Sequence, residues 1–184
     1  MITRTLLIFV LSLCAAVAVQ AATTQRDHLT PQEVDLVKEA QILDKRIDVF
    51  IKAAERRLMV INNSASASAN AKQLKKDSER WGELPTGSRA ELVGDIARIF
   101  DEAITNIDDV SARDERNPLI AKSLRKLATA VNTIMGQLKP LSTEAKSDAE
   151  IASFELLNED AQSILEAVTK LPPEVIDKKA KKNN

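Results

Sequence analysis

Apolar residues recur at intervals of three and four along several long stretches of this 184-residue chain, and few glycines or prolines interrupt them. This spacing gathers apolar side chains on one face of an α-helix, whereas a half-buried strand needs strict alternation. The chain has four glycines and only 3% aromatic residues, which is unlike the composition of β-sandwiches and barrels. The sequence therefore predicts an all-α fold.

Capping and breaking residues set the expected helix boundaries. Thr30-Pro31-Gln32-Glu33 combines a capping threonine, a proline at the first helical position and a glutamate three residues after the cap. Asn117-Pro118 is expected to open another helix that Pro140 stops, and Ser142 or Thr143 can cap the next one. The predicted helices cover approximately residues 31–61, 89–116, 118–139 and 143–171, with a short helix near 72–81.

The arrangement of these helices follows from the connections between them. Few residues join the helices at 89–116, 118–139 and 143–171, so we expect them to run antiparallel as neighbours. The expected fold is an antiparallel four-helix bundle with an aliphatic, alanine-rich core, formed by residues 30–171 as a single domain. Two helical hairpins without a shared core are the alternative.

Both ends of the chain differ from the bundle in composition. Residues 1–21 contain Arg4 followed by an uncharged apolar run of about 14 residues, which is typical of a secretory signal and shorter than the roughly 20 of a membrane span. We expect an exported protein, periplasmic or secreted, with no stable membrane span after cleavage. Residues 22–29 are predicted to be a flexible leader and residues 172–184 a basic disordered tail.

The composition also excludes several chemistries. The 26 basic and 27 acidic residues give a net charge of −1, which argues against nucleic-acid binding. The one cysteine, Cys14, lies in the predicted signal, and the one histidine, His28, lies in the leader, where we expect it to be exposed to solvent. No Glu-x-x-His pair, haem motif, catalytic triad or phosphate loop is present. We therefore predict no catalytic residue, no cofactor and no metal site, and expect a protein that is not an enzyme.

The helix predicted at 31–61 carries a second apolar line opposite its main stripe, where a surface helix should be polar. One interpretation is that the segment 62–88 covers this line, and the other is that a partner helix or a second copy of the chain contacts it. Trp81, in a Trp-Gly-Glu-Leu-Pro-Thr-Gly turn, either plugs this loop onto the core or offers a ligand platform. The candidate interaction surface is Ile42, Val49, Ala53, Val60 and Trp81.

Leu29-Thr30-Pro31-Gln32 is similar to the Leu-Thr-x-x-Gln motif of small helical periplasmic chaperones of the Spy and CpxP type, although Glu33 stands at the glutamine position and the motif occurs once. Helix capping accounts for the same residues, so we do not assign the chain to that family. The leading hypothesis is a non-catalytic envelope or secreted protein that acts through protein contacts as a scaffold, adaptor or homo-oligomer. The alternatives are a periplasmic chaperone or stress-response binder of apolar segments and, third, a carboxylate-based metal binder or enzyme.

Overall fold

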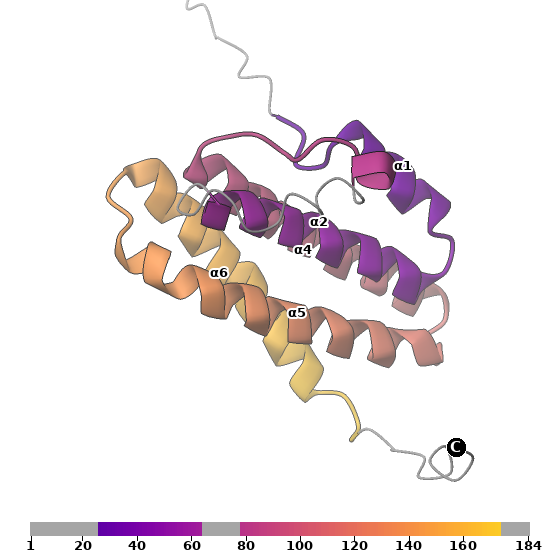
Figure 1. The fold of residues 1–184 in the computed structure, drawn as a ribbon. Coiled ribbons are helices and arrows are strands. Elements are labelled where there is room, and N and C mark those ends of the chain that lie inside the picture. Colours follow the sequence, from indigo (N-terminus) through magenta and orange to yellow (C-terminus); the bar gives the residue numbers. More distant parts are fainter. Residues whose placement is uncertain (1–25, 64–77, 174–184) are drawn as a thin grey trace, which may run out of the picture.

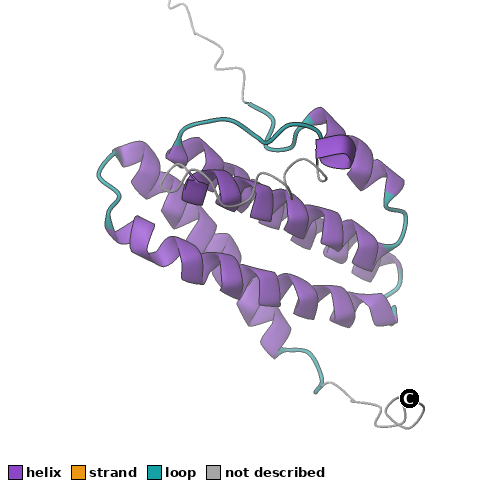
Figure 2. Cartoon of the chain, in the orientation of Figure 1, coloured by secondary structure: helices purple, strands orange, loops and turns teal. Residues whose placement is uncertain are grey.

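The computed structural model of the chain describes residues 26–63 and 78–173, which form helices and loops without strands (Figures 1 and 2). The predicted all-α fold is confirmed, and the helices pack against one another as a helical bundle. The predicted signal, residues 72–77 of the expected short helix and most of the basic tail lie outside the described residues, and residues 78–81 are helical. The labelled helices are α1 (Pro31–Glu39), α2 (Leu43–Asn63), α4 (Arg89–Arg113), α5 (Pro118–Thr143) and α6 (Asp148–Thr169).

The longest predicted helix, residues 31–61, is divided in the structure, so that prediction is wrong. α1 ends at Glu39 and α2 begins at Leu43, although no glycine or proline stands between them. α1 folds back along α2 (Figure 1), and among the described helices it is in contact with α2 alone. The apolar spacing continues through the break, so the bend comes from tertiary contacts and not from a local helix breaker.

Side chains on both sides of the break hold this bend. The Arg46 Nε atom donates a hydrogen bond to the Ala40 carbonyl at 3.0 Å, and Arg46 also reaches Asn106 of α4 at 3.0 Å. The Gln41 amide donates to the Lys38 carbonyl at 2.5 Å. The bonds to the Ala40 and Lys38 carbonyls satisfy groups that the end of α1 leaves without a helical partner.

The junction of α5 and α6 also differs from the prediction. α5 continues through Pro140 and ends at Thr143, so the proline removes one helical hydrogen bond near the end of the helix and does not stop it. The cap of α6 is Ser147, which accepts a hydrogen bond from the third helical amide at 3.2 Å, and not Ser142 or Thr143. At its other end, α5 begins as predicted with Asn117 as the cap.

The predicted apolar stripes meet in one core. The broadest stripe belongs to α4, which ends at Arg113, three residues before its predicted end. Burying aliphatic side chains in this way is the main source of stability in such a bundle. Its most deeply buried apolar members are Ile47, Phe50, Ala53, Ala54, Val93, Ile96, Ala97, Ile99, Phe100, Ala103, Leu127, Val131 and Leu157.

The helices are not all neighbours in the predicted order. α4 packs mainly against α2 and α6, and α5 packs against α6 and α2, so α4 and α5 lie diagonally across the core with little mutual contact. The expectation that these two consecutive helices are close neighbours is therefore wrong. The short connection between α4 and α5 makes the two helices run in opposite directions, but it does not determine which helices pack together. The wide apolar face of α4 is covered only when other helices pack on both sides of it.

Candidate functional site

Four charged side chains lie buried where α1, α2 and α4 meet: Glu33, Arg56, Arg57 and Asp95, each at most 2% exposed. We call them the buried charge cluster. The Glu33 Oε1 atom lies 2.6 Å from Arg57 Nη1 and 3.1 Å from Arg56 Nε, and Asp95 lies 3.9 Å from Arg57 Nε. Burying a charge costs free energy unless the charge is paired. The ion pairs of the cluster connect Glu33 of α1 to α2 and, through Arg57, to Asp95 of α4.

Glu33 has two roles, of which the sequence predicted one. Its Oε2 atom accepts a hydrogen bond from the Thr30 amide at 2.9 Å, as the predicted capping box requires. Its Oε1 atom binds the two arginines, and that role was missed. The sequence contains one signal for this role. Arg56 and Arg57 lie on either side of the second apolar line on the helical wheel, so a fold that buries this line also buries the two arginines.

Residues 26–29, which we call the N-terminal strap, pack against α4 and α2. Arg26 forms an ion pair with Asp95, and the His28 Nε2 atom lies 2.7 Å from Glu102. The His28 carbonyl accepts a hydrogen bond from Arg57 at 2.6 Å, and Leu29 is buried. Of the predicted flexible leader 22–29, residues 26–29 are therefore held against the bundle, while residues 22–25 lie outside the described residues. The expectation that His28 is exposed to solvent is wrong, because its side chain is only 28% exposed.

Burial is the dominant influence on Asp95. It raises the pKa of this carboxyl group, while the neighbouring Arg26, Arg57 and Arg98 act in the opposite direction. Each carboxylate of the cluster lies within ion-pair distance of an arginine. The cluster therefore serves to attach α1 and the N-terminal strap to the bundle.

The candidate interaction surface is largely internal. Val49 and Ala53 are 8% and 0% exposed, Val60 is half-buried, and only Ile42 stands out at 56%. α1 folds back along α2, and Val34 and Val37 of α1 pack against the core to which Ala53 belongs, while residues 64–77 of the segment 62–88 lie outside the described residues. These residues do not form an exposed apolar line on the surface of the bundle.

Trp81 contacts the buried charge cluster from outside. Its ring centroid lies 5.7 Å from the guanidinium carbon of Arg56, which is within range of a cation–π interaction. Arg56 also donates hydrogen bonds to the carbonyls of Gly82 and Glu83, at 3.2 and 2.5 Å. Gly82 has a φ of +67°, a conformation that favours glycine and turns the chain back over Arg56. Trp81 therefore helps to seat this loop on the bundle.

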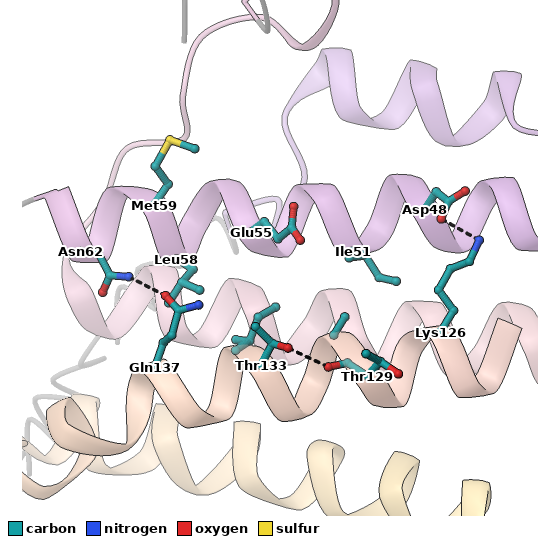
Figure 3. Close-up of a pocket in the computed structure, with 12 residues that line it drawn as sticks. Asp48, Ile51, Glu55, Leu58, Met59, Asn62, Lys126, Thr129, Thr133 and Gln137 are labelled. Carbon is teal, nitrogen blue, oxygen red and sulfur yellow. Dashed lines mark hydrogen bonds and ion pairs between the residues drawn. The ribbon is translucent and has the colours of Figure 1, made fainter. Parts of the chain in front are cut away.

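A groove of about 670 Å³ lies between α2 and α5, and we call it the α2–α5 groove (Figure 3). An ion pair between Asp48 and Lys126 at 2.7 Å lies at one end, and a hydrogen bond from Asn62 to Gln137 at 3.1 Å lies at the other. The remaining lining residues are Ile51, Glu55, Leu58, Met59, Thr129, Ala130, Thr133 and Ile134.

The groove combines an apolar floor with hydrogen-bond acceptors. Leu58 and Ile134 are buried below it, while Glu55 and the threonines are exposed on its walls. The hydroxyl groups of Thr129 and Thr133 donate to carbonyls one turn back in α5, so each offers an oxygen lone pair to the groove. Because Asp48 and Glu55 face one Lys126, the lining has a net negative charge.

The carboxyl group of Asp160 in α6 makes the stability of the bundle depend on pH. Burial raises its pKa to about 6, and the nearby carboxylates of Asp101 and Glu159 add to this shift. At this group the folded chain then binds more protons than the unfolded chain between about pH 4 and pH 6, so the contribution of Asp160 to the free energy of unfolding falls as pH rises through this window.

We expect Asp160→Asn to remove this fall and to make the protein more stable than the parent at neutral pH. Urea unfolding at a series of pH values measures the effect, with Asp108→Asn, at an exposed position of α4, as the matched control. An unchanged slope in the Asp160 variant would contradict the assignment.

Within the described ranges, no helix is long and apolar enough to cross a membrane, and no three His, Cys, Asp or Glu side chains are grouped so that they could hold a metal ion. Comparison of the chain with protein-family models, with curated proteins and with solved structures gives no match.

Proposed function

We propose that this protein is a non-catalytic, exported helical protein that acts by binding another polypeptide in the α2–α5 groove. The observation that carries the proposal is the combination of an apolar floor with exposed acceptors between two helices. Contacts of this kind bind an amphipathic helix through its apolar face.

The lining also indicates what such a helix must carry. The distance from Asp48 to Asn62 corresponds to about 21 Å of helix at 1.5 Å per residue. The negative balance of the lining and the free lone pairs of Thr129 and Thr133 favour hydrogen-bond donors. We therefore propose a partner helix of about four turns with apolar residues on one face and a lysine or arginine opposite Glu55.

Site-specific photo-cross-linking tests the proposal. A photoreactive amino acid at Thr133, in the groove, is expected to capture a polypeptide in the native cell, whereas the same amino acid at the exposed Thr105 of α4 is the control. A peptide matching the captured segment is then synthesised, and its binding to the purified protein is measured by fluorescence anisotropy.

Charge reversal in the groove supplies the decisive measurement. Glu55→Lys is expected to raise the Kd of that peptide about tenfold, because a repulsive contact replaces an attractive one. Asp109→Lys makes the same change of charge on α4 and should leave the Kd unaltered. Equal capture at Thr133 and Thr105, or a Kd that Glu55→Lys leaves unchanged, would contradict the proposal. Capture of many unrelated segments, with suppressed aggregation of an unfolded client, would favour the chaperone function instead.

A further inference from the structure

The bend at residues 40–42 opposes the local preference of its own sequence. Alanine is the best helix former and glutamine is a good one, so Ala40 and Gln41 are suited to the interior of a helix. In the structure Ala40 has φ −76° and ψ 83°, which is not helical. The chain thus has a second arrangement available, in which α1 and α2 form one straight helix, as the apolar spacing predicts.

α1 and the N-terminal strap are peripheral to the bundle. Among the described helices α1 contacts α2 alone, and the strap reaches α4 through Arg26 and His28. The main bonds of this unit to the cluster, from Arg26, His28 and Glu33, end on residues that lie beyond the bend. The same unit from another copy of the chain could form each of these bonds with identical geometry.

Straightening the bend would leave an empty site at the buried charge cluster, and the strap and α1 of another copy fit this site. It would uncover the charges of Arg57 and Asp95, which are 1% exposed in the bent form and are bound there by Glu33, the His28 carbonyl and Arg26. An uncompensated buried charge is strongly destabilising, so this surface needs a ligand that supplies a carboxylate at the position of Glu33 and a cation at the position of Arg26.

We propose that two copies of the chain exchange residues 26–39, so that the strap and α1 of each copy occupy the buried charge cluster of the other. Such an exchange is reciprocal and closes as a symmetric dimer. It keeps the contacts that the strap and α1 make with the cluster, and it exchanges the hydrogen bonds from Arg46 and Gln41 that hold each bend for helical hydrogen bonds. It also costs the entropy of association. The dimer therefore forms as the protein concentration rises, and it depends on α1 and not on the α2–α5 groove.

Two substitutions at the exposed Gln41 separate the arrangements. Gln41→Ala removes the hydrogen bond to the Lys38 carbonyl that holds the bend and favours the straight helix. Gln41→Pro is compatible with the non-helical Ala40 but disrupts a continuous helix. In sedimentation velocity over a concentration series, we expect Gln41→Ala to raise the association constant about tenfold and Gln41→Pro to lower it at least about tenfold.

A mixing experiment distinguishes exchange from association through another surface. Glu33→Arg and Arg57→Glu each place like charges together in the cluster, but exchange between the two variants pairs opposite charges at both sites. We expect an equimolar mixture to form a mixed dimer with a higher Tm than either variant alone, and Glu55→Lys to leave dimerisation unchanged.

Two results would overturn the proposal. One is a protein that stays monomeric, in the parent and the Gln41→Ala forms, at every concentration reached. The other is a dimer whose association constant is the same in the Gln41→Ala and Gln41→Pro variants.

Discussion

Aspartate in place of Ile47 is expected to leave the chain unfolded. Ile47 is fully buried and belongs to the cluster of apolar side chains that forms the core of the bundle. An unpaired carboxylate in such surroundings costs several kcal/mol, which approaches the total stability of about 5–15 kcal/mol of a typical domain. Circular dichroism at room temperature should lose most of the helical signal.

Two matched substitutions on the second apolar line compare Val49, a buried position of α2, with Ile42, an exposed position in the bend. Val49→Asp, at 8% exposure, is expected to destabilise the protein by about 2–4 kcal/mol, whereas Ile42→Asp, at 56% exposure, should change stability by less than about 0.5 kcal/mol. Urea unfolding of the three variants measures the order. If Val49→Asp were as well tolerated as Ile42→Asp, Val49 would not be buried in the folded protein.

The second large effect is expected at Arg57, which contacts both carboxylates of the buried charge cluster. Arg57→Met should destabilise the protein by about 3–5 kcal/mol, because Glu33 and Asp95 each lose a buried partner. Arg98→Met is the control, since Arg98 also approaches Asp95, at 3.7 Å, but is 39% exposed. Exposed ion pairs contribute only about 0–1 kcal/mol, so that change should be small.

A double-mutant cycle shows whether Glu33 is the partner that matters. Glu33→Gln keeps an oxygen for the helix cap and removes the charge. Combined with Arg57→Met, it should cost clearly less than the sum of the two single changes, because one interaction is lost in both. Additive losses would mean that the two side chains do not stabilise each other.

The helices could be predicted from the sequence because their determinants are local. Apolar spacing and the caps at Thr30 and Asn117 act within a few residues, and the structure contains both caps. The bend at 40–42 was missed because nothing within those three residues requires it. It depends on Glu33 reaching Arg57, 24 residues away, and on Arg26 reaching Asp95, 69 residues away.

The α2–α5 groove could not be predicted from the sequence, because it also depends on tertiary packing. Each wall is an ordinary exposed helix face, and the depth of the groove depends on how far apart α2 and α5 stand. Residues such as Glu55 and Thr133 have no local pattern that marks them. The predicted interaction surface failed for a different reason. The apolar line that includes Val49 and Ala53 is real, but both side chains are buried within the folded chain.

The diagonal placement of α4 and α5 affects how the protein compacts as it is synthesised. These helices are consecutive but share little surface, so the pair emerging from the ribosome has no stable hairpin to form. Both find their main apolar neighbour in α6, the last labelled helix of the chain. The part of the core that α4 and α5 share with α6 therefore closes only when the C-terminal helix has been made, whereas the packing of α2 against α4 can form before it.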